Sequence, residues 1–429
     1  MKERIAIIDG VRAPFGKAGG ILSGFGADDL GAVVVKELLA RAELSGEEVD
    51  ELIFGNVAQP VDAANVARVI ALKAGLPKQM PSYTVQRNCA SGMESITTAA
   101  NKIQAGEIGL AICGGTESMS NIPFLYRREM VGIFTQLFRA RSLMQKLKAL
   151  LAFRPRFLAP IVGVQQGLTD PVCGMNMGMT AELLVRDFHI TREEQDAFAL
   201  ESHRKACRAS ENGVFEQETV PLPVYPEYRN VHYKDEGPRG DQSLEALAKL
   251  RPYFDRETGT VTVGNACPIT DGAVAVLVAS ESRARELGLN PLGYLRDYCY
   301  AGLEGERMGL GPAYASAKLF KKTGMRLRDF DLVELNEAFA AQVIANERAF
   351  SSRAFAREYL GRDEALGELD RERLNVNGGS IALGHPVGAT GARLVLTLLK
   401  ELKRRGREKG LATLCVGGGQ GAALALEVA

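Results

Sequence analysis

The sequence has few of the features that mark membrane-spanning, nucleic-acid-binding or disulfide-stabilised proteins. No apolar run reaches the ~18 residues that a membrane-spanning helix requires. The formal net charge is zero, with 52 basic and 52 acidic residues, so no general field attracts nucleic acid. The seven cysteines include no C-x-x-C pair, and an odd number is a poor disulfide framework. We therefore expect a protein of a reducing compartment, the cytoplasm.

The composition, with 46% hydrophobic residues, is that of a globular protein. The length of 429 residues suggests two or three domains. The first ten residues lead directly into an apolar run at Ile5–Ile8, so we expect no secretory signal. Much of the abundant glycine follows apolar runs, where tight turns let a backbone approach a ligand closely.

Short β-branched runs alternate with longer amphipathic segments along both ends of the chain. This alternation predicts a mostly parallel sheet whose faces are covered by helices. The predicted strands are Ile5–Ile8, Glu51–Phe54, Tyr83–Val85, Leu110–Cys113, Leu332–Leu335 and Leu411–Val416. The predicted helices are Asp28–Ala42, Ala64–Ala74, Ser91–Ile103, Arg192–Ala209 and Ala392–Leu402, and Thr191 with Glu194 forms a capping-box spacing before the fourth of them.

Two local similarities indicate an internal duplication. The stretch from Gly109 resembles the stretch from Gly410, and 50–56 is loosely matched by 331–336. Chance agreement between buried strands is the alternative explanation. We divide the chain into an N-terminal half (1–120 with 271–291), an inserted loop domain that forms a lid (121–270, rich in loops as at Pro221–Gly240) and a C-terminal half (292–429).

Cys89 is the strongest single candidate for chemistry. It lies in Gln86-Arg-Asn-Cys89-Ala-Ser-Gly, where a predicted strand ends and a helix begins. Backbone N–H groups at a helix N-terminus favour negative charge, so we expect a lowered thiol pKa. The same groups can hold the oxyanion of a thioester under attack. The alternative is a small, inert cysteine that packs a helix start.

A thiolate nucleophile needs a base, and the chain has only four histidines. His385 has glycine on both sides and is followed by a proline, so a substrate can come close to it; a structural histidine in a loop is the alternative. The other three histidines are interpreted as surface residues: His189, His203 and His232.

Two further candidates also follow predicted strands. Cys415 precedes the glycine cluster from Gly417 to Gly421, which would expose backbone N–H groups, although a plain strand-to-turn cluster has the same composition. Asn336 begins Asn-Glu-Ala-Phe and can alternatively cap the following helix. In a doubly covered sheet, ligands collect at the strand ends where these residues fall.

These motifs together resemble the four signatures of the thiolase family, in the family's order. They are Asn88-Cys89-Ala-Ser-Gly, Asn336-Glu-Ala-Phe, Gly384-His385-Pro386 and Cys415-Val-Gly-Gly-Gly. Supporting pieces include Arg12-Ala-Pro-Phe-Gly16, Gly114-Gly-Thr-Glu-Ser118 and Met177-Gly-Met-Thr-Ala-Glu182. The resemblance implies a five-layered αβαβα fold of two duplicated βαβαβαββ halves with a loop domain that binds coenzyme A.

The resemblance also implies roles for single residues. Cys89 matches the nucleophile that accepts the acyl group, His385 the base that activates it, and Cys415 the acid/base at the α-carbon. Asn336 matches the residue that positions a catalytic water in the first oxyanion hole. The N–H groups of Cys89 and Gly417 match the second hole. The reaction is then thiolysis of 3-ketoacyl-CoA or condensation of acetyl-CoA, with ping-pong kinetics and no cofactor or metal.

Contacts to coenzyme A are expected at four positions: Met177, Arg239, Cys267 and Phe339. Two of them depart from the family pattern. Asn176-Met177 replaces a frequent His-Met, and Cys267-Pro268 replaces Ser-Gly, which removes a hydroxyl that contacts the coenzyme. These departures concern the preference for acyl-chain length.

The segment 127–158 is a basic amphipathic insertion. From Tyr126 to Leu158 the chain has eight Lys/Arg and a single acid, Glu129, interleaved with large apolar residues. Such a stretch is typical of a membrane surface or of a partner groove. It resembles the insertion in thiolase subunits of fatty-acid β-oxidation complexes; the alternative is a lid helix packed on its own protein.

Two other functions stay open from the sequence. A β-ketoacyl synthase has a related fold but typically lacks the Cys-x-Gly-Gly-Gly ending and the Asn-Glu-Ala-Phe motif, both of which are present. A non-catalytic acyl-CoA-binding relative would have lost Cys89 or His385. The family habit is a homodimer or homotetramer.

Overall fold

The computed structural model describes residues 3–223 and 229–428, so residues 224–228 of the predicted loop Pro221–Gly240 lie outside the described residues. The N-terminal half of its central sheet is formed mainly by strands buried on both faces, which explains their continuous apolar runs. The strands of this half are β1 (Ile5–Arg12), β3 (Glu51–Gly55), β4 (Ser82–Val85), β5 (Leu110–Glu117) and β10 (Thr270–Ser280), with the short β2 (Gly16–Lys17) paired to β10. Of these, the edge strand β4 and the short β2 are partly exposed.

The C-terminal half adds β11 (Gly293–Gly302), β12 (Leu332–Leu335), β13 (Lys409–Val416) and β14 (Gln420–Val428). Pairing of Ile5 with Leu295 joins β1 to β11, which gives the strand order β12-β13-β14-β11-β1-β10-β5-β3-β4. The two halves therefore meet along their first strands.

The expected mostly parallel sheet is wrong. Only β3–β4, β3–β5 and β12–β13 pair in parallel, while the other pairs along this path are antiparallel. The cause is direct succession of strands: β13 reaches β14 through the glycines 417–419, and such a tight turn allows only antiparallel pairing. A run buried on both faces looks the same in either direction, so the sequence pattern carried no information on orientation.

The internal duplication is confirmed by matching strand ends. Asp50 Oδ2 accepts hydrogen bonds from the N–H groups of Gly109 and Leu110, at 2.7 and 2.9 Å. Asp331 Oδ2 accepts them from Glu408 and Lys409 at 3.1 and 3.0 Å. Each aspartate thus joins the start of one strand to the start of its parallel neighbour. The first pair is β3 with β5, and the second is β12 with β13.

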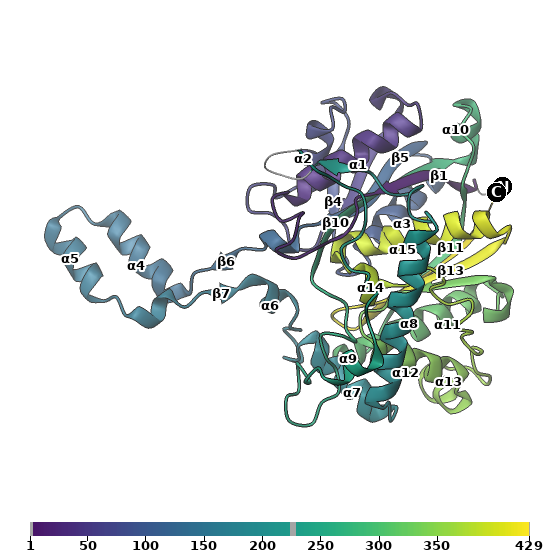
Figure 1. Cartoon of the computed structure of the whole chain (residues 1–429). Helices are drawn as coiled ribbons and strands as arrows, with labels where there is room; N and C mark the ends of the chain where they lie inside the picture. Colours follow the sequence, from purple (N-terminus) through teal and green to yellow (C-terminus); the bar gives the residue numbers. More distant parts are fainter. Residues whose placement is uncertain (1–2, 224–228, 429) are drawn as a thin grey trace.

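In Figure 1 helices lie above, between and below the strands, and three large apolar clusters account for the expected five layers. The central cluster contains α3 (Ser91–Gln104) and α15 (Val387–Arg405). One outer cluster contains α1 (Ala27–Arg41) and α2 (Val66–Lys73), and the other contains α11 (Gly311–Thr323) and α12 (Ala340–Ser351). The predicted helices in these regions are confirmed to within a few residues, except that α15 begins five residues before its predicted start.

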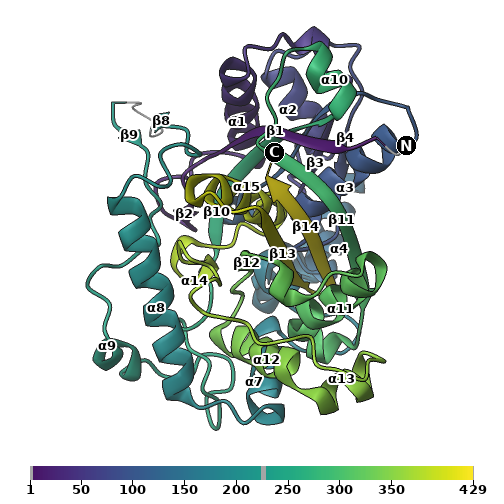
Figure 2. The same ribbon diagram turned by 90° about the vertical axis from the view of Figure 1, so that its right-hand side faces the viewer.

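The chain between β5 and β10 carries the lid region. Its main helices are α7 (Met177–Asp187), α8 (Arg192–Glu211) and α9 (Leu244–Ala248), with the short pair β8 (Leu222–Pro223) and β9 (Val231–His232). The predicted capping box of α8 is confirmed, since Thr191 and Glu194 bond each other's backbone N–H. Figure 2 shows α8 beside α14 (Ser380–Leu383). The remaining helices are α10 (Glu281–Glu286) and α13 (Arg353–Tyr359).

A buried guanidinium fixes the lid region to the N-terminal half. Arg12 is 1% exposed and bonds Glu218 at 2.6 Å and both carboxylate oxygens of Asp235 at 2.6 and 2.8 Å. Both acids belong to the inserted chain. Because a buried charge must be paired, this contact holds the lid at a defined position over the sheet.

The basic insertion forms a helical hairpin that extends away from the body (Figure 1). A ribbon of β6 (Phe124–Leu125) and β7 (Ile161–Val162) leads into α4 (Arg128–Arg139) and α5 (Leu143–Leu151), and α6 (Gly163–Gly167) leads back. The two long helices pack on each other, and only Met130, Ile133 and Ala149 are buried in them. The alternative of a lid helix packed on its own protein is therefore wrong. Within the described residues, no helix has the length and apolar character to cross a membrane.

Candidate active site

The candidate nucleophile lies at the start of α3, against the start of α15. Asn88 has a φ of +43°, a conformation that asparagine tolerates better than most residues, and it turns the chain so that Cys89 precedes the helix. A Cβ added to Gly92 would lie 2.6 Å from Ala392 N and 3.1 Å from Gly388 O. Only glycine allows this approach, which brings the helix start after Cys89 against the one after His385.

His385 is buried and its ring is held by one hydrogen bond. Nδ1 lies 2.6 Å from Thr390 Oγ1, and that hydroxyl donates to the Pro386 carbonyl at 2.9 Å. A hydroxyl has a single proton, so Thr390 must accept from His385 at this bond. Nδ1 therefore carries the ring proton, and Nε2 is left with the lone pair that a base needs.

The imidazole is neutral at physiological pH. Burial and, after it, the positive charge of Arg393 lower the pKa of His385 to about 4. A neutral ring can accept a proton from a neighbouring thiol, whereas an imidazolium could not.

The expectation of a lowered pKa at Cys89 is wrong. The N–H groups of Gly417 and of Cys89 itself do favour the thiolate, but burial outweighs them and raises the pKa of Cys89. Asn88 fixes the Gly417 turn, because its Nδ2 donates to the Gly417 carbonyl at 2.7 Å. The thiol is thus protonated at rest and depends on a base for its activation.

Cys415 and Cys267 lie within electrostatic reach of Cys89. Burial raises the pKa of Cys415 well above its usual range, and the charges of Cys89 and Cys267 raise it further. Burial and the charge of Cys89 likewise raise the pKa of Cys267 to about 12. Three protonated thiols therefore gather at the candidate site.

Asn336 is fully buried and presents an unused donor. Its Oδ1 accepts from Ser380 Oγ at 2.6 Å, and this bond sets the orientation of the amide. Its Nδ2 has no hydrogen-bond partner among the described residues. Since an unpaired buried N–H costs free energy, this donor is suited to hold a water molecule or a ligand.

The predicted coenzyme contacts fall in two places. Met177 Sδ lies 3.4 Å from where a Gly417 Cβ would stand, so Met177 borders the site. Cys267 and Phe339 are brought together because Cys267 N–H donates to Ala338 O at 3.0 Å. Arg239 is exposed, on a loop whose Gly237 packs against α14.

Sequence reasoning missed several residues around the site and misjudged one histidine. Thr390, Ser380 and Glu117 have structural roles that no local pattern predicts, although all lie in or next to quoted motifs. His203 is 5% exposed and its Nδ1 accepts from Arg239 N–H at 3.3 Å, so the surface interpretation of this residue is wrong. His189 is exposed, as expected.

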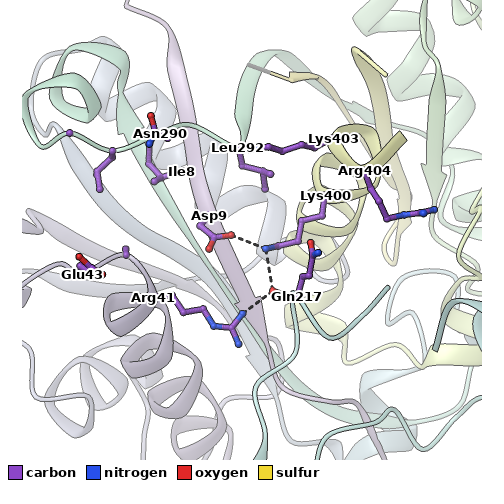
Figure 3. Close-up of a pocket in the computed structure, with 13 residues that line it drawn as sticks. Ile8, Asp9, Arg41, Glu43, Gln217, Asn290, Leu292, Lys400, Lys403 and Arg404 are labelled. Atoms are coloured by element: carbon purple, nitrogen blue, oxygen red, sulfur yellow. Dashed lines mark hydrogen bonds and ion pairs between the residues drawn. The ribbon is translucent and has the colours of Figure 1, made fainter. Parts of the chain in front are cut away.

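A surface hollow of about 620 Å³ lies away from these groups, beside β1 and the C-terminal ends of α1 and α15 (Figure 3). Two of its cations are paired: Lys400 bonds Asp9 at 2.8 Å, and Arg41 donates to the Gln217 carbonyl at 2.8 Å. None of the candidate site residues lines this hollow. Within 3–223 and 229–428, no three His, Cys, Asp or Glu side chains are arranged to hold a metal ion.

Comparison with known families decides the identity. The model of the thiolase N-terminal domain matches residues 5–282, and that of the thiolase C-terminal domain matches residues 289–428. The chain belongs to the thiolase family. This thiolase is 44% identical to the 3-ketoacyl-CoA thiolases of Yersinia pestis and Yersinia pseudotuberculosis, over 99% of this chain and 97% of each relative.

Solved structures agree with this assignment. The acetyl-CoA acetyltransferase of Bacillus anthracis superposes with a TM-score of 0.87 at 40% identity, covering 100% of this thiolase and 99% of that chain. The human mitochondrial 3-ketoacyl-CoA thiolase in complex with CoA gives 0.86 at 36% identity, covering 100% and 98%. The expected family and fold are thus confirmed.

The neutral state of His385 predicts an unusual pH profile for Cys89 alkylation. Because the ring stays unprotonated down to about pH 4, the rate with iodoacetamide relative to its value at pH 7 should hold to about pH 5 and fall only below it. An ordinary histidine would lose base function below about pH 6.5. Mass spectrometry of the Cys89 peptide measures the rate.

The matched control is His385→Gln, which should react more slowly at pH 7 and lose about tenfold in rate per pH unit below it, because its alkylation then follows the thiolate fraction of Cys89 alone. An acid limb centred near pH 6.5 in the wild type would contradict the buried, neutral imidazole.

Proposed function

We propose that this protein catalyses reversible acyl transfer between coenzyme A thioesters through an acyl intermediate on Cys89. The substrate is a 3-ketoacyl-CoA that is cleaved by CoA, or acetyl-CoA in the reverse condensation. The observation that carries the proposal is that the helix starts after Cys89 and after His385 adjoin, while Cys415, at the end of β13, lies within electrostatic reach of Cys89. The names of the relatives, 3-ketoacyl-CoA thiolase and acetyl-CoA acetyltransferase, agree with it.

In the first half-reaction, Nε2 of His385 takes the thiol proton of Cys89. The thiolate attacks the 3-keto carbon, and the carbonyl electrons move onto oxygen. When this intermediate collapses, the bond between C2 and C3 breaks and its electron pair goes to C2. Cys415 donates its proton to that carbon, which releases acetyl-CoA and leaves the acyl chain on Cys89.

In the second half-reaction, the Cys415 thiolate takes the proton of an incoming CoA thiol. The CoA sulfur attacks the acyl carbon, and Cys89 leaves as a thiolate and recovers its proton from His385. Both cysteines and the histidine then return to their starting states. Two half-reactions on one nucleophile give ping-pong kinetics.

Two sets of donors stabilise the oxyanions. The N–H groups of Cys89 and Gly417 already act on the Cys89 sulfur and form the hole at the acyl carbon. The first oxyanion hole combines His385 with a water held by Nδ2 of Asn336, which has no described partner of its own. We assign both sets of roles by the family motifs together with these contacts.

Coenzyme A enters over the lid region, against Met177, Cys267 and Phe339, with Arg239 at the exposed end. The proposal needs no additional cofactor, because the thiols and imidazole supply nucleophile, acid and base. We assign the cleavage direction as the physiological one, since the relatives at 44% identity are named for 3-ketoacyl-CoA. All seven cysteines are free thiols, which agrees with a reducing, cytoplasmic location.

Substitution of the two cysteines separates their roles. Cys89→Ser should lower turnover of acetoacetyl-CoA with CoA on the order of 10³-fold or more, because the nucleophile is lost. Cys415→Ser should still be acylated on Cys89 by a preformed acyl-CoA, within about tenfold, because a CoA thiolate can leave with little help from an acid; it should lose condensation by roughly 10²–10⁴-fold, because proton transfer at the α-carbon depends on Cys415. Loss of the 1,3-diketone absorbance measures turnover, and intact-mass spectrometry measures acylation.

Equal loss of both half-reactions in Cys415→Ser would contradict the separate roles. Wild-type protein that binds acetoacetyl-CoA without any fall in absorbance would instead show a non-catalytic binding protein.

We further propose that the hairpin of α4 and α5 docks to an anionic membrane surface. The segment 127–158 that contains this hairpin carries eight cations and a single acid. Several large apolar side chains on it are largely exposed, among them Phe138 at 92%, Leu143 at 85% and Leu151 at 70%. Free apolar patches of this kind usually meet a lipid or protein surface. The high positive charge favours anionic lipid headgroups over a protein groove.

Vesicle sedimentation at low salt tests the docking. Wild-type protein should pellet with phosphatidylserine vesicles, and replacing Arg139, Arg141, Lys146 and Lys148 with serine should weaken binding at least about tenfold. The matched control replaces four exposed cations of the body with serine: Arg326, Arg328, Lys403 and Arg407. Equal pelleting of all three proteins would reject the membrane and leave a partner subunit of a multienzyme complex as the occupant.

We also propose that the enzyme is a homodimer or a homotetramer. The strand β4 ends the sheet order, and its residues Ser82–Val85 are half-exposed along one edge. An unpaired edge next to the catalytic turn is a natural place for a second copy. Sedimentation velocity should give at least a dimer at micromolar concentration, and a monomer there would contradict the proposal.

A further inference from the structure

Glu117 is a buried carboxylate that joins three separate parts of the chain beside the candidate site. It is the last residue of β5 and is 1% exposed. Oε1 accepts from Asn56 Nδ2 at 2.9 Å and from Ala58 N–H at 3.0 Å. Oε2 accepts from Val57 N–H at 3.1 Å and from Gly388 N–H at 2.9 Å. Each oxygen therefore meets two donors.

The bond to Gly388 links this carboxylate to the catalytic histidine. Gly388 is the second residue of α15 and lies three residues after His385. Two residues further on, Thr390 bonds the imidazole Nδ1. The first turn of α15 thus carries the group that fixes the orientation of the base, and Glu117 is bonded to the beginning of that turn.

The packing at this point leaves little freedom. A Cβ added to Gly388 would lie 2.8 Å from Thr116 O and 2.9 Å from Glu117 Oε2, and a Cβ at Gly115 would collide with the Gly388 carbonyl. The start of α15 is therefore pressed against the end of β5. Any change in the position of Glu117 is transmitted to the helix turn, and not absorbed by empty space.

We propose that Glu117 is a positioning residue for the acyl-transfer reaction, which holds the first turn of α15 so that the His385 imidazole faces the Cys89 thiol. The inference rests on the proposed function, since it presumes that His385 activates Cys89. It assigns to Glu117 no contact with substrate. A carboxylate suits this position because four donors surround it, whereas an amide would turn its own N–H groups toward one pair of them.

The test is Glu117→Gln, which keeps the size of the side chain but places an NH₂ group against two donors. We expect kcat per active site to fall about 10–100-fold, because a small misplacement of a catalytic group costs that much. KM for acetoacetyl-CoA should change less than about threefold. The rate of Cys89 alkylation by iodoacetamide at pH 7, which needs no acyl-CoA, should fall about tenfold.

The matched control is Asp50→Asn at the opposite end of β5. Asp50 also accepts two backbone N–H bonds, from Gly109 and Leu110, but it lies far along the strand from His385. This variant should keep both the wild-type kcat per folded protein and the wild-type alkylation rate. Folded protein is counted by the near-ultraviolet circular dichroism signal.

Two results would overturn the positioning role. If folded Glu117→Gln protein keeps the wild-type kcat and the wild-type alkylation rate, Glu117 is only a structural anchor. Faster alkylation would show that it acts through its charge alone, because the negative charge of Glu117 raises the pKa of Cys89. Failure of the proposed function itself would look different. The wild-type protein would then show no acyl transfer, although Glu117→Gln would still change the rate of Cys89 alkylation.

Discussion

The close contact between the starts of α3 and α15 is the constraint on which the rest of the site depends. Glycines at 92 and 391 are required there, since a Cβ at either would lie 2.6 Å from the backbone of the opposite helix. Each half of the duplicated fold contributes one of these two helices to the central layer. The proposed nucleophile and its proposed base therefore come from different halves, so the proposed site needs both.

Burial sets the charge state of the site in the absence of substrate. It raises the thiol pKa values of Cys89 and Cys415 and lowers the pKa of His385, so the resting groups are all neutral. A thiolate and an imidazolium inside a protein would be costly without pairing. Charge is thus created only when a proton moves from Cys89 to His385, beside N–H groups that are already in position for it. This arrangement reserves the electrostatic stabilisation for the reacting state.

The sequence predicted what depends on local chemistry. Capping of α8 by Thr191 and Glu194 and the motif around Cys89 involve neighbours in the chain. The prediction of strand direction was wrong, because burial on both faces removes the alternating pattern that would indicate the direction. The prediction of a lowered pKa for Cys89 was wrong because the effect of a helix N-terminus is local, whereas desolvation depends on the whole fold. Glu117 escaped notice since its partners Val57 and Gly388 lie 60 and 271 residues away.

The same electrostatics explain how one of three neighbouring thiols becomes the nucleophile. The thiolates of Cys267 and Cys415 are each stabilised only by their own backbone N–H. The charge of a neighbouring cysteine raises the pKa of each thiol further. Cys89 gains the N–H of Gly417 in addition to its own. Once His385 has taken a proton, the thiolate is therefore most stable on Cys89. At the proposed coenzyme contact, Cys267 in place of a family serine therefore adds no competing nucleophile.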